Sequence, residues 1–139
     1  MDSNTKLKGS CLCGSVKLSF DFENENFHAC HCGYCRKWGG GPLFSVDSNK
    51  NLKFEGEEFV GVYSSSEWAE RGFCKNCGSH LFYRLKDGNL ANVPLGILEN
   101  PQDFKLDVQI FIDKKLPNYN FAEKTHMMTE AEVFAQFAP

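Results

Sequence analysis

The sequence has no long apolar run and no cluster of basic residues. A helix that crosses a membrane needs about 18 or more apolar residues in succession, and no segment approaches that length. No run of Lys and Arg exceeds two residues, and 15 basic against 18 acidic residues give a net charge of −3. These features argue against a membrane partner and a nucleic-acid partner. Because the N-terminal residues also lack the apolar segment of a secretory signal, we expect a soluble, cytoplasmic protein.

The composition also excludes intrinsic disorder. Of the 139 residues, 42% are hydrophobic and 13 are Phe, which is ample material for a hydrophobic core. A chain of about 100 to 200 residues usually forms one domain. No internal repeat, low-complexity segment or linker divides the sequence. We therefore expect residues 1–139 to fold as a single domain.

The strand signals predict a mainly β protein. From Val16, apolar residues alternate with Lys, Ser, Asp and Glu, which is typical of a strand with one face in water. One helix signal lies near the end of the chain, where Thr129 and Glu132 have the spacing of a capping box ahead of Val133 and Phe134. We expect a short C-terminal helix there and no helix elsewhere. The expected strands cover residues 16–22, 43–46, 59–63, 80–85 and 108–112.

The cysteines need a chemical explanation. Seven among 139 residues is many for a cytosolic protein, yet below the roughly 8–10% that marks a secreted disulfide scaffold. The number is odd, and neighbouring cysteines can converge on one ion, so metal binding fits better than disulfides. Thiolates at such spacings favour zinc, with an iron–sulfur cluster as the minor alternative. The clusters are Cys11 and Cys13; Cys30, Cys32 and Cys35; and Cys74 and Cys77.

Seven thiols divide naturally into a group of four and a group of three. A closed four-thiolate zinc site is structural, whereas three protein ligands and one open position are the arrangement of catalytic zinc. The CxxCG sequence at residues 74–78 has the form of a zinc knuckle, in which Gly78 tolerates the left-handed backbone of the turn. We therefore predict up to two zinc ions, one held by Cys11, Cys13, Cys74 and Cys77 and one by Cys30, Cys32 and Cys35.

Two alternatives remain open from the residues alone. In the first, a zinc ribbon forms from Cys32, Cys35, Cys74 and Cys77. In the second, the triad is a closed structural site completed by His28, His31 or Asp47. Side chains alternate along an extended chain, so His31 should point away from its cysteine neighbours, and His28 is the better fourth ligand.

Three motifs together resemble one known family. They are residues 9–14 (GSCLCG), 30–37 (CHCGYCRK) and 71–79 (RGFCKNCGS), followed by two weaker matches at 96–101 and 112–117. In order and spacing the sequence resembles the glutathione-dependent formaldehyde-activating enzyme family, which also includes centromere protein V. The resemblance covers roughly residues 7 to 121.

The resemblance implies a β-tent fold of several coiled antiparallel sheets around a structural zinc. It also implies catalytic zinc on Cys30, Cys32 and Cys35, and an activity: the reversible addition of glutathione to formaldehyde, which makes the family carbon–sulfur lyases of the S-hydroxymethylglutathione synthase type. The expected partners are therefore a small thiol, glutathione, and an aldehyde.

The chemistry of three thiolates agrees with such a reaction. Zinc with three thiolates carries one net negative charge, so it is a weak Lewis acid but accepts a fourth, soft sulfur. Glutathione has two carboxylates and one ammonium group, so its site should offer cations and amides. Candidate substrate contacts are Tyr34 as a proton donor, the cations Arg36, Lys37 and Arg71, and Trp38 with the glycines of residues 39–41.

A different class of function competes with catalysis. Both zinc ions could be structural, in a non-catalytic interaction module or a carrier of glutathione. Arg36 and Lys37 would then be an ordinary solvated pair, and Trp38 a packing residue. The behaviour of the two metal sites towards a chelator discriminates between these readings, because only an open site should release its ion without unfolding the protein.

Overall fold

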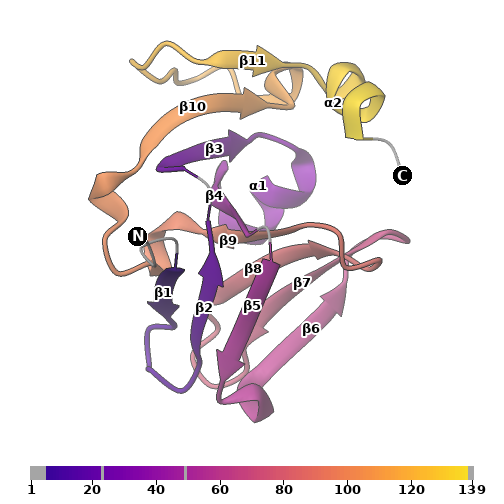
Figure 1. Cartoon of the computed structure of the whole chain (residues 1–139). Helices are drawn as coiled ribbons and strands as arrows, with labels where there is room; N and C mark the ends of the chain where they lie inside the picture. The colour runs from indigo at the N-terminus through magenta and orange to yellow at the C-terminus, as the bar shows by residue number, and fades with distance from the viewer. Residues whose placement is uncertain (1–5, 23, 49, 138–139) are drawn as a thin grey trace.

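The structure, a computed structural model, describes residues 6–22, 24–48 and 50–137. Most of its regular elements are strands (Figure 1). A small sheet contains three strands in the order β1-β2-β5. Both pairings in this sheet are antiparallel. The strands are β1 (Lys6–Ser10), β2 (Lys17–Asp21) and β5 (Lys50–Glu55).

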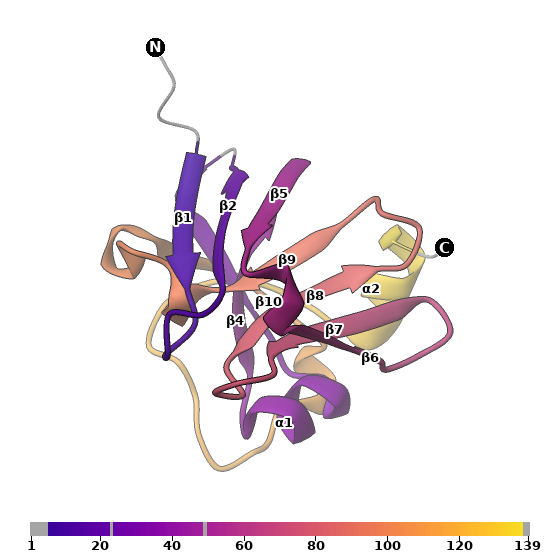
Figure 2. The ribbon, with the colours of Figure 1, turned by 90° about the horizontal axis from the view of Figure 1, so that it is seen from below.

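The large sheet has eight strands, in the order β11-β10-β3-β4-β9-β8-β7-β6. The expected mainly β architecture is confirmed. Figure 2 shows the small sheet standing at an angle beside the large one. The strands of the large sheet are β3 (Asn26–Cys30), β4 (Leu43–Ser48), β6 (Val60–Ser64), β7 (Ala69–Cys74), β8 (His80–Leu85), β9 (Ala91–Pro94), β10 (Lys105–Ile110) and β11 (His126–Met128).

The core lies between the two sheets, and the alternating pattern of β2 explains why. Leu18 and Phe20 are buried while Lys17 is exposed, as the sequence predicts. Phe20 belongs to the same buried cluster as Phe82 of β8 and Val93 of β9. A single bridge between Gly9 and Leu98 also ties β1 to the segment after β9. Burial of apolar side chains from both sheets therefore holds them together.

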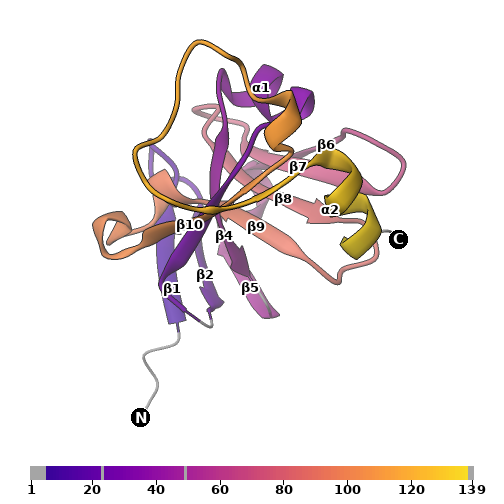
Figure 3. The same cartoon turned by 90° about the horizontal axis from the view of Figure 1, so that it is seen from above.

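The expectation of antiparallel sheets is wrong for β10. This strand pairs in parallel with β3 on one side and with β11 on the other. Parallel neighbours need a long crossover connection. Between β10 and β11 that connection includes a 3-10 turn at Ile112–Lys114 and then curves round the end of the molecule (Figure 3). Such a pairing joins segments far apart in sequence, so local periodicity does not reveal it.

The expectation that helices occur only near the C-terminus is also wrong. Helix α1 (Gly33–Gly39) follows β3 directly. The Cys32 sulfur caps its start by accepting the Cys35 N–H, and Gly40 ends it with a φ of 90°. A sulfur cap is not among the usual N-cap signals, and the helix contains two glycines, which are poor helix formers. The sequence therefore gave no ordinary helix signal at this point.

The predicted C-terminal helix is present as α2 (Glu130–Phe137). Its capping box forms as expected: the Thr129 hydroxyl accepts the Glu132 N–H at 3.2 Å, and the Glu132 carboxylate accepts the Thr129 N–H at 2.9 Å. Neither helix in the described part of the chain has the length and apolar character needed to span a membrane.

Candidate metal centres

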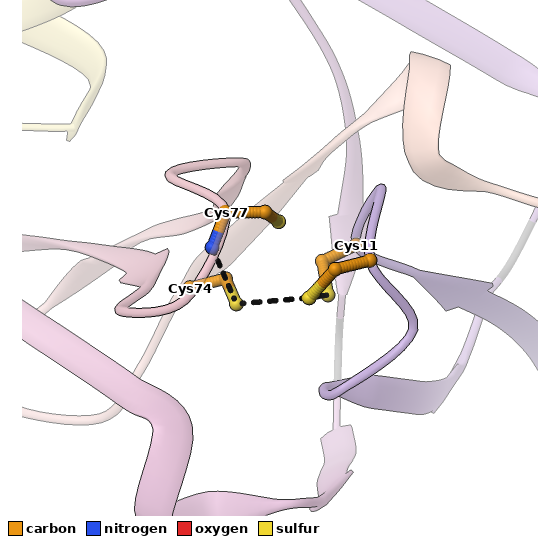
Figure 4. A group of neighbouring side chains, drawn as sticks. Cys11, Cys74 and Cys77 are labelled. Carbon is orange, nitrogen blue, oxygen red and sulfur yellow. Dashed lines mark hydrogen bonds between the residues drawn. The ribbon is translucent and has the colours of Figure 1, made fainter.

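The first centre is a group of four sulfurs between the two sheets. The loop after β1 contributes Cys11 and Cys13, the last residue of β7 is Cys74, and the turn that follows contributes Cys77. All four sulfurs lie within 4.8 Å of one another. Figure 4 shows the side chains of Cys11, Cys74 and Cys77 turned towards a common point.

The spacing of these sulfurs fits a tetrahedral zinc ion. Zn–S bonds of about 2.3 Å place the sulfurs of a tetrahedron about 3.8 Å apart. The Sγ atoms of Cys11 and Cys13 are 3.6 Å apart, and those of Cys13 and Cys74 are 3.8 Å apart. Every donor is a thiol, the ligand type that zinc prefers in closed structural sites. The residues present therefore fit a structural zinc.

Hydrogen bonds to the sulfurs also prepare this group for a cation. The main-chain N–H of Val16 donates to Cys11 Sγ at 3.3 Å, and the Asn76 side-chain amide donates to Cys13 Sγ at 3.3 Å. A hydrogen bond with Ser79 lowers the pKa of Cys77 to about 5. Such bonds stabilise thiolates, the form of cysteine that binds metal.

Two glycines shape the turns that present these sulfurs. Gly14 follows Cys13 with a φ of 81°, and Gly78 follows Cys77 with a φ of 83°. Both angles lie in the left-handed region, which glycine adopts without a steric penalty. The left-handed turn predicted at Gly78 is thus present.

The second group lies where β3 passes into α1. Cys30 ends β3, Cys32 caps α1 and Cys35 is buried within α1. Their sulfurs also lie within 4.8 Å of one another, and among the described residues neither a histidine nor a carboxylate joins this group. The seven sulfurs are thus brought together as four and three, and not in the zinc-ribbon arrangement. Figure 2 shows α1 at the end of the molecule away from the N-terminus.

The thiols of the triad interact strongly with one another. Hydrogen bonds from Cys30 and Cys35 lower the pKa of Cys32 to about 2. The bond to Cys32 and burial raise the pKa of Cys30. The Cys30 bond favours ionisation of Cys35, but Cys32 and burial outweigh it and raise the pKa of Cys35 to about 11. Of the three thiols, Cys32 is therefore the one that ionises most readily, and its sulfur also accepts the Cys35 main-chain N–H at 3.3 Å.

His28 is engaged by other residues and not by the triad. Its Nε2 lies 2.9 Å from Asp47 Oδ1, and the Asn92 amide donates to the same oxygen at 2.5 Å. Burial disfavours the charged ring, but the hydrogen bond and charge of Asp47 raise the pKa of His28. Two of the three proposed fourth ligands thus bind each other.

His31 points away from the sulfurs, as the alternation along an extended chain predicts. The ring is only 3% exposed, and its Nε2 lies 2.8 Å from Gln109 Oε1. Because an amide oxygen can only accept, Nε2 donates, and Nδ1 of the neutral ring accepts the Tyr119 hydroxyl at 3.0 Å. Burial lowers the pKa of His31, in agreement with a neutral ring. Gln109 and Tyr119 thereby brace the loop between Cys30 and Cys32, a role that sequence reasoning missed.

Three predicted substrate contacts lie on the surface of α1. Tyr34 is 56% exposed, and Lys37 is exposed. Arg36 is half-buried, and its Nη1 donates to the carbonyl of Lys114 at 3.2 Å. None of these side chains makes a hydrogen bond to a triad sulfur within the described residues. Their role in binding substrate stays a prediction.

The other two predicted contacts belong to a layered stack against the triad. The Arg71 side chain is 4% exposed, and both terminal nitrogens lie 3.7 Å from Cys35 Sγ. Its guanidinium carbon is 4.9 Å from the ring centres of Trp38 and Tyr83. Trp38 in turn stacks on His80, with the ring centres 3.8 Å apart.

Sequence reasoning missed Tyr83 and His80. Tyr83 faces Arg71 through the register of β7 and β8, which a single sequence does not show. Burial raises the pKa of Tyr83, so the phenol holds its proton. Burial and the charge of Arg71 lower the pKa of His80, so this ring is neutral.

Fold and sulfur geometry together define a mainly β protein with two candidate thiol–metal centres. The profile of the family described as glutathione-dependent formaldehyde-activating enzyme matches residues 6–114, which include all seven cysteines. The chain therefore belongs to this family.

Two relatives support the assignment. An uncharacterized lyase of Schizosaccharomyces pombe is 35% identical over 127 residues, covering 91% of this chain and 93% of the relative. The crystal structure of a Rhodobacter sphaeroides protein is similar with a TM-score of 0.60 and 25% identity, covering 71% of this chain and 98% of that one.

Proposed function

We propose that the protein is a zinc-dependent carbon–sulfur lyase that adds glutathione, or a related thiol, reversibly to formaldehyde to give S-hydroxymethylglutathione. Family membership and the name of the yeast relative support a lyase of this kind. We place the reaction in the cytoplasm, where glutathione is abundant and cysteines stay reduced.

The observation that carries the proposal is the difference between the two sulfur groups. The first has four thiols, which complete a tetrahedron. The second has three, with no fourth ligand from the described histidines and carboxylates. A zinc ion held by Cys30, Cys32 and Cys35 would supply one free coordination position, at which a soft thiol binds and ionises at neutral pH.

The protein's own side chains would orient the reactants, balance their charge and donate the proton that the reaction needs. In the forward direction, the thiol sulfur bonds to the carbonyl carbon, the C=O π electrons move to oxygen, and that oxygen takes up a proton. The reverse reaction breaks the C–S bond. Tyr83, whose raised pKa keeps the phenol protonated, is a candidate proton donor, alongside the exposed Tyr34.

The test is the rate of exchange between glutathione and its formaldehyde adduct, measured by exchange NMR on zinc-loaded protein. We expect catalysis above the spontaneous rate in the wild type and its loss in Cys32→Ser, which should still fold and bind one zinc ion instead of two. Lys53→Ala is a control, because Lys53 is an exposed residue of β5 in the small sheet.

Two results would contradict the proposal. A wild type that carries two zinc ions and shows no acceleration would not be this lyase. If both ions also resist mild chelation, the non-catalytic module with two structural sites is the better description. Full activity in Cys32→Ser would show that catalysis does not use the triad.

A further inference from the structure

Within the described residues, Arg71 is a buried cation without a carboxylate partner. It lies on β7 between Tyr63 of β6 and Tyr83 of β8 in the register of the sheet, and its side chain is 4% exposed. Arginine stays protonated in proteins, and a buried charge is costly unless an opposite charge compensates it. None of the ion pairs among the described residues includes Arg71. Its counter-charge must therefore come from another kind of group.

The contacts of the guanidinium identify that group. Both terminal nitrogens lie 3.7 Å from Cys35 Sγ, and the rings of Trp38 and Tyr83 lie 4.9 Å from the guanidinium carbon. The remaining nitrogen, Nε, is buried and has no partner within the described residues. Because the aromatic contacts carry no net charge, Cys35 Sγ is the one contact of the guanidinium within the described residues that becomes an anion when the thiol binds a metal ion as a thiolate.

The charge of a metal-loaded triad shows what this contact does. Three thiolates around a divalent cation would carry one net negative charge, and the Arg71 guanidinium would offset it. An anionic fourth ligand would then approach a centre that is close to neutral instead of one that is negative. Within the described residues, the sulfurs of the four-cysteine group accept hydrogen bonds from main-chain N–H groups, Asn76 and Ser79, and none of these donors is a cation.

We propose that Arg71 is a positioning residue that acts through Cys35 to make the triad selective for an anionic, thiolate ligand over a neutral one. The inference rests on the proposed function, because it names the ligand class of the same site. Trp38 and Tyr83 hold the guanidinium in place by cation–π contacts. Like charges at about 4 Å repel strongly in a partly buried site, so loss of this cation should penalise an anionic ligand specifically.

The test compares two ligands on cobalt-loaded protein, in which absorption of Co²⁺ reports a change of ligand at the open site. Glutathione is the anionic ligand and imidazole the neutral one. For Arg71→Met we expect about tenfold or greater weakening of glutathione binding. Imidazole binding should change less than about threefold, and Arg71→Lys should restore most of the glutathione affinity because it restores the charge.

A matched control is Arg84→Met. Arg84 lies on the neighbouring strand β8, is half-buried, contacts the ring of Phe82 and pairs with Glu70 at 2.6 Å. It makes no hydrogen bond to a triad sulfur in the described structure, so the ratio of glutathione to imidazole affinity should match the wild type.

The inference is overturned if Arg71→Met weakens the binding of glutathione and imidazole equally, or weakens neither. If this variant does not fold, Arg71→Gln decides: a neutral side chain that can still donate should lower the affinity ratio, and an unchanged ratio refutes selectivity by charge. Formaldehyde is absent from the assay. A failure of the proposed reaction would therefore show as missing exchange with intact ligand selectivity, so the two failures are distinguishable.

Discussion

Replacement of Cys77 by Ser should unfold the protein, whereas replacement of Cys30 by Ser should not. Cys77 belongs to the group that links the loop after β1 to the turn between β7 and β8, and so links the two sheets. A structural zinc contributes about 10–16 kcal/mol of apparent binding free energy. The total stability of a domain is only about 5–15 kcal/mol. Loss of a zinc ion bound by this group would therefore remove about as much free energy as stabilises the whole fold.

Burial makes the loss of this ion more damaging. Cys11 is 3% exposed and Cys74 is fully buried, so their sulfurs cannot turn to water once the ion is gone. In the triad, which lies at the start of a short helix, Cys35 alone is buried, and Cys30 and Cys32 are partly buried. A Ser at position 30 should cost about 1–2 kcal/mol, within the usual range for a single substitution.

Thermal unfolding followed by circular dichroism, with zinc counted by mass spectrometry, measures both effects. We expect Cys77→Ser to lack a cooperative transition and Cys30→Ser to melt cooperatively with one zinc ion bound. A Cys77→Ser variant that melts like the wild type, beside an unfolded Cys30→Ser, would show that the roles of the two groups are reversed.

Three further variants test the packing and charge of the fold. Gly72→Ala should lower the free energy of unfolding in urea by about 1–3 kcal/mol, because the alanine Cβ would lie 2.1 Å from the ring of Phe82. A second substitution in the same chain, Phe82→Leu, should recover part of this lost stability. Tyr119→Phe removes the hydroxyl that donates to His31 and should lower the free energy of unfolding by about 0.5–1.5 kcal/mol. It should also speed the release of zinc from the triad and not from the four-cysteine group. Equally faster release from both sites would contradict this prediction. Hydrogen bonds from the Thr129 N–H and hydroxyl lower the pKa of Glu132, so the ionised carboxylate stabilises the protein above the pKa of the unfolded state. This stabilisation is lost as the pH falls through the folded-state pKa of Glu132. In Glu132→Gln the free energy of unfolding should therefore depend less on pH in that range, and an unchanged pH profile would refute the capping role.

Short-range patterns in the sequence predicted much of this molecule. The alternation along β2, the capping box of α2 and the left-handed turn at Gly78 depend on neighbouring residues, and all three are present. The division of the cysteines into four and three follows from coordination number, which chemistry fixes before folding is considered.

Features that depend on distant parts of the chain were not predictable in this way. The parallel pairing of β10 with β3 joins segments far apart in sequence. The position of Arg71 against Cys35 depends on how β7 meets α1, so the sequence offered Arg71 only as one of several cations for substrate. Helix α1 was missed for a local reason, because a cysteine sulfur takes the place of the usual oxygen cap.

The pairing of β10 with β3 orders events during synthesis of the chain. The last sulfur of the four-cysteine group is Cys77, so that group can assemble while the remaining residues are still on the ribosome. Cys30, by contrast, pairs with Ile110, and His31 receives its hydroxyl partner only from Tyr119. A nascent chain could thus complete the four-cysteine group, with the zinc ion that we propose for it, before the segments that brace the triad have been synthesised.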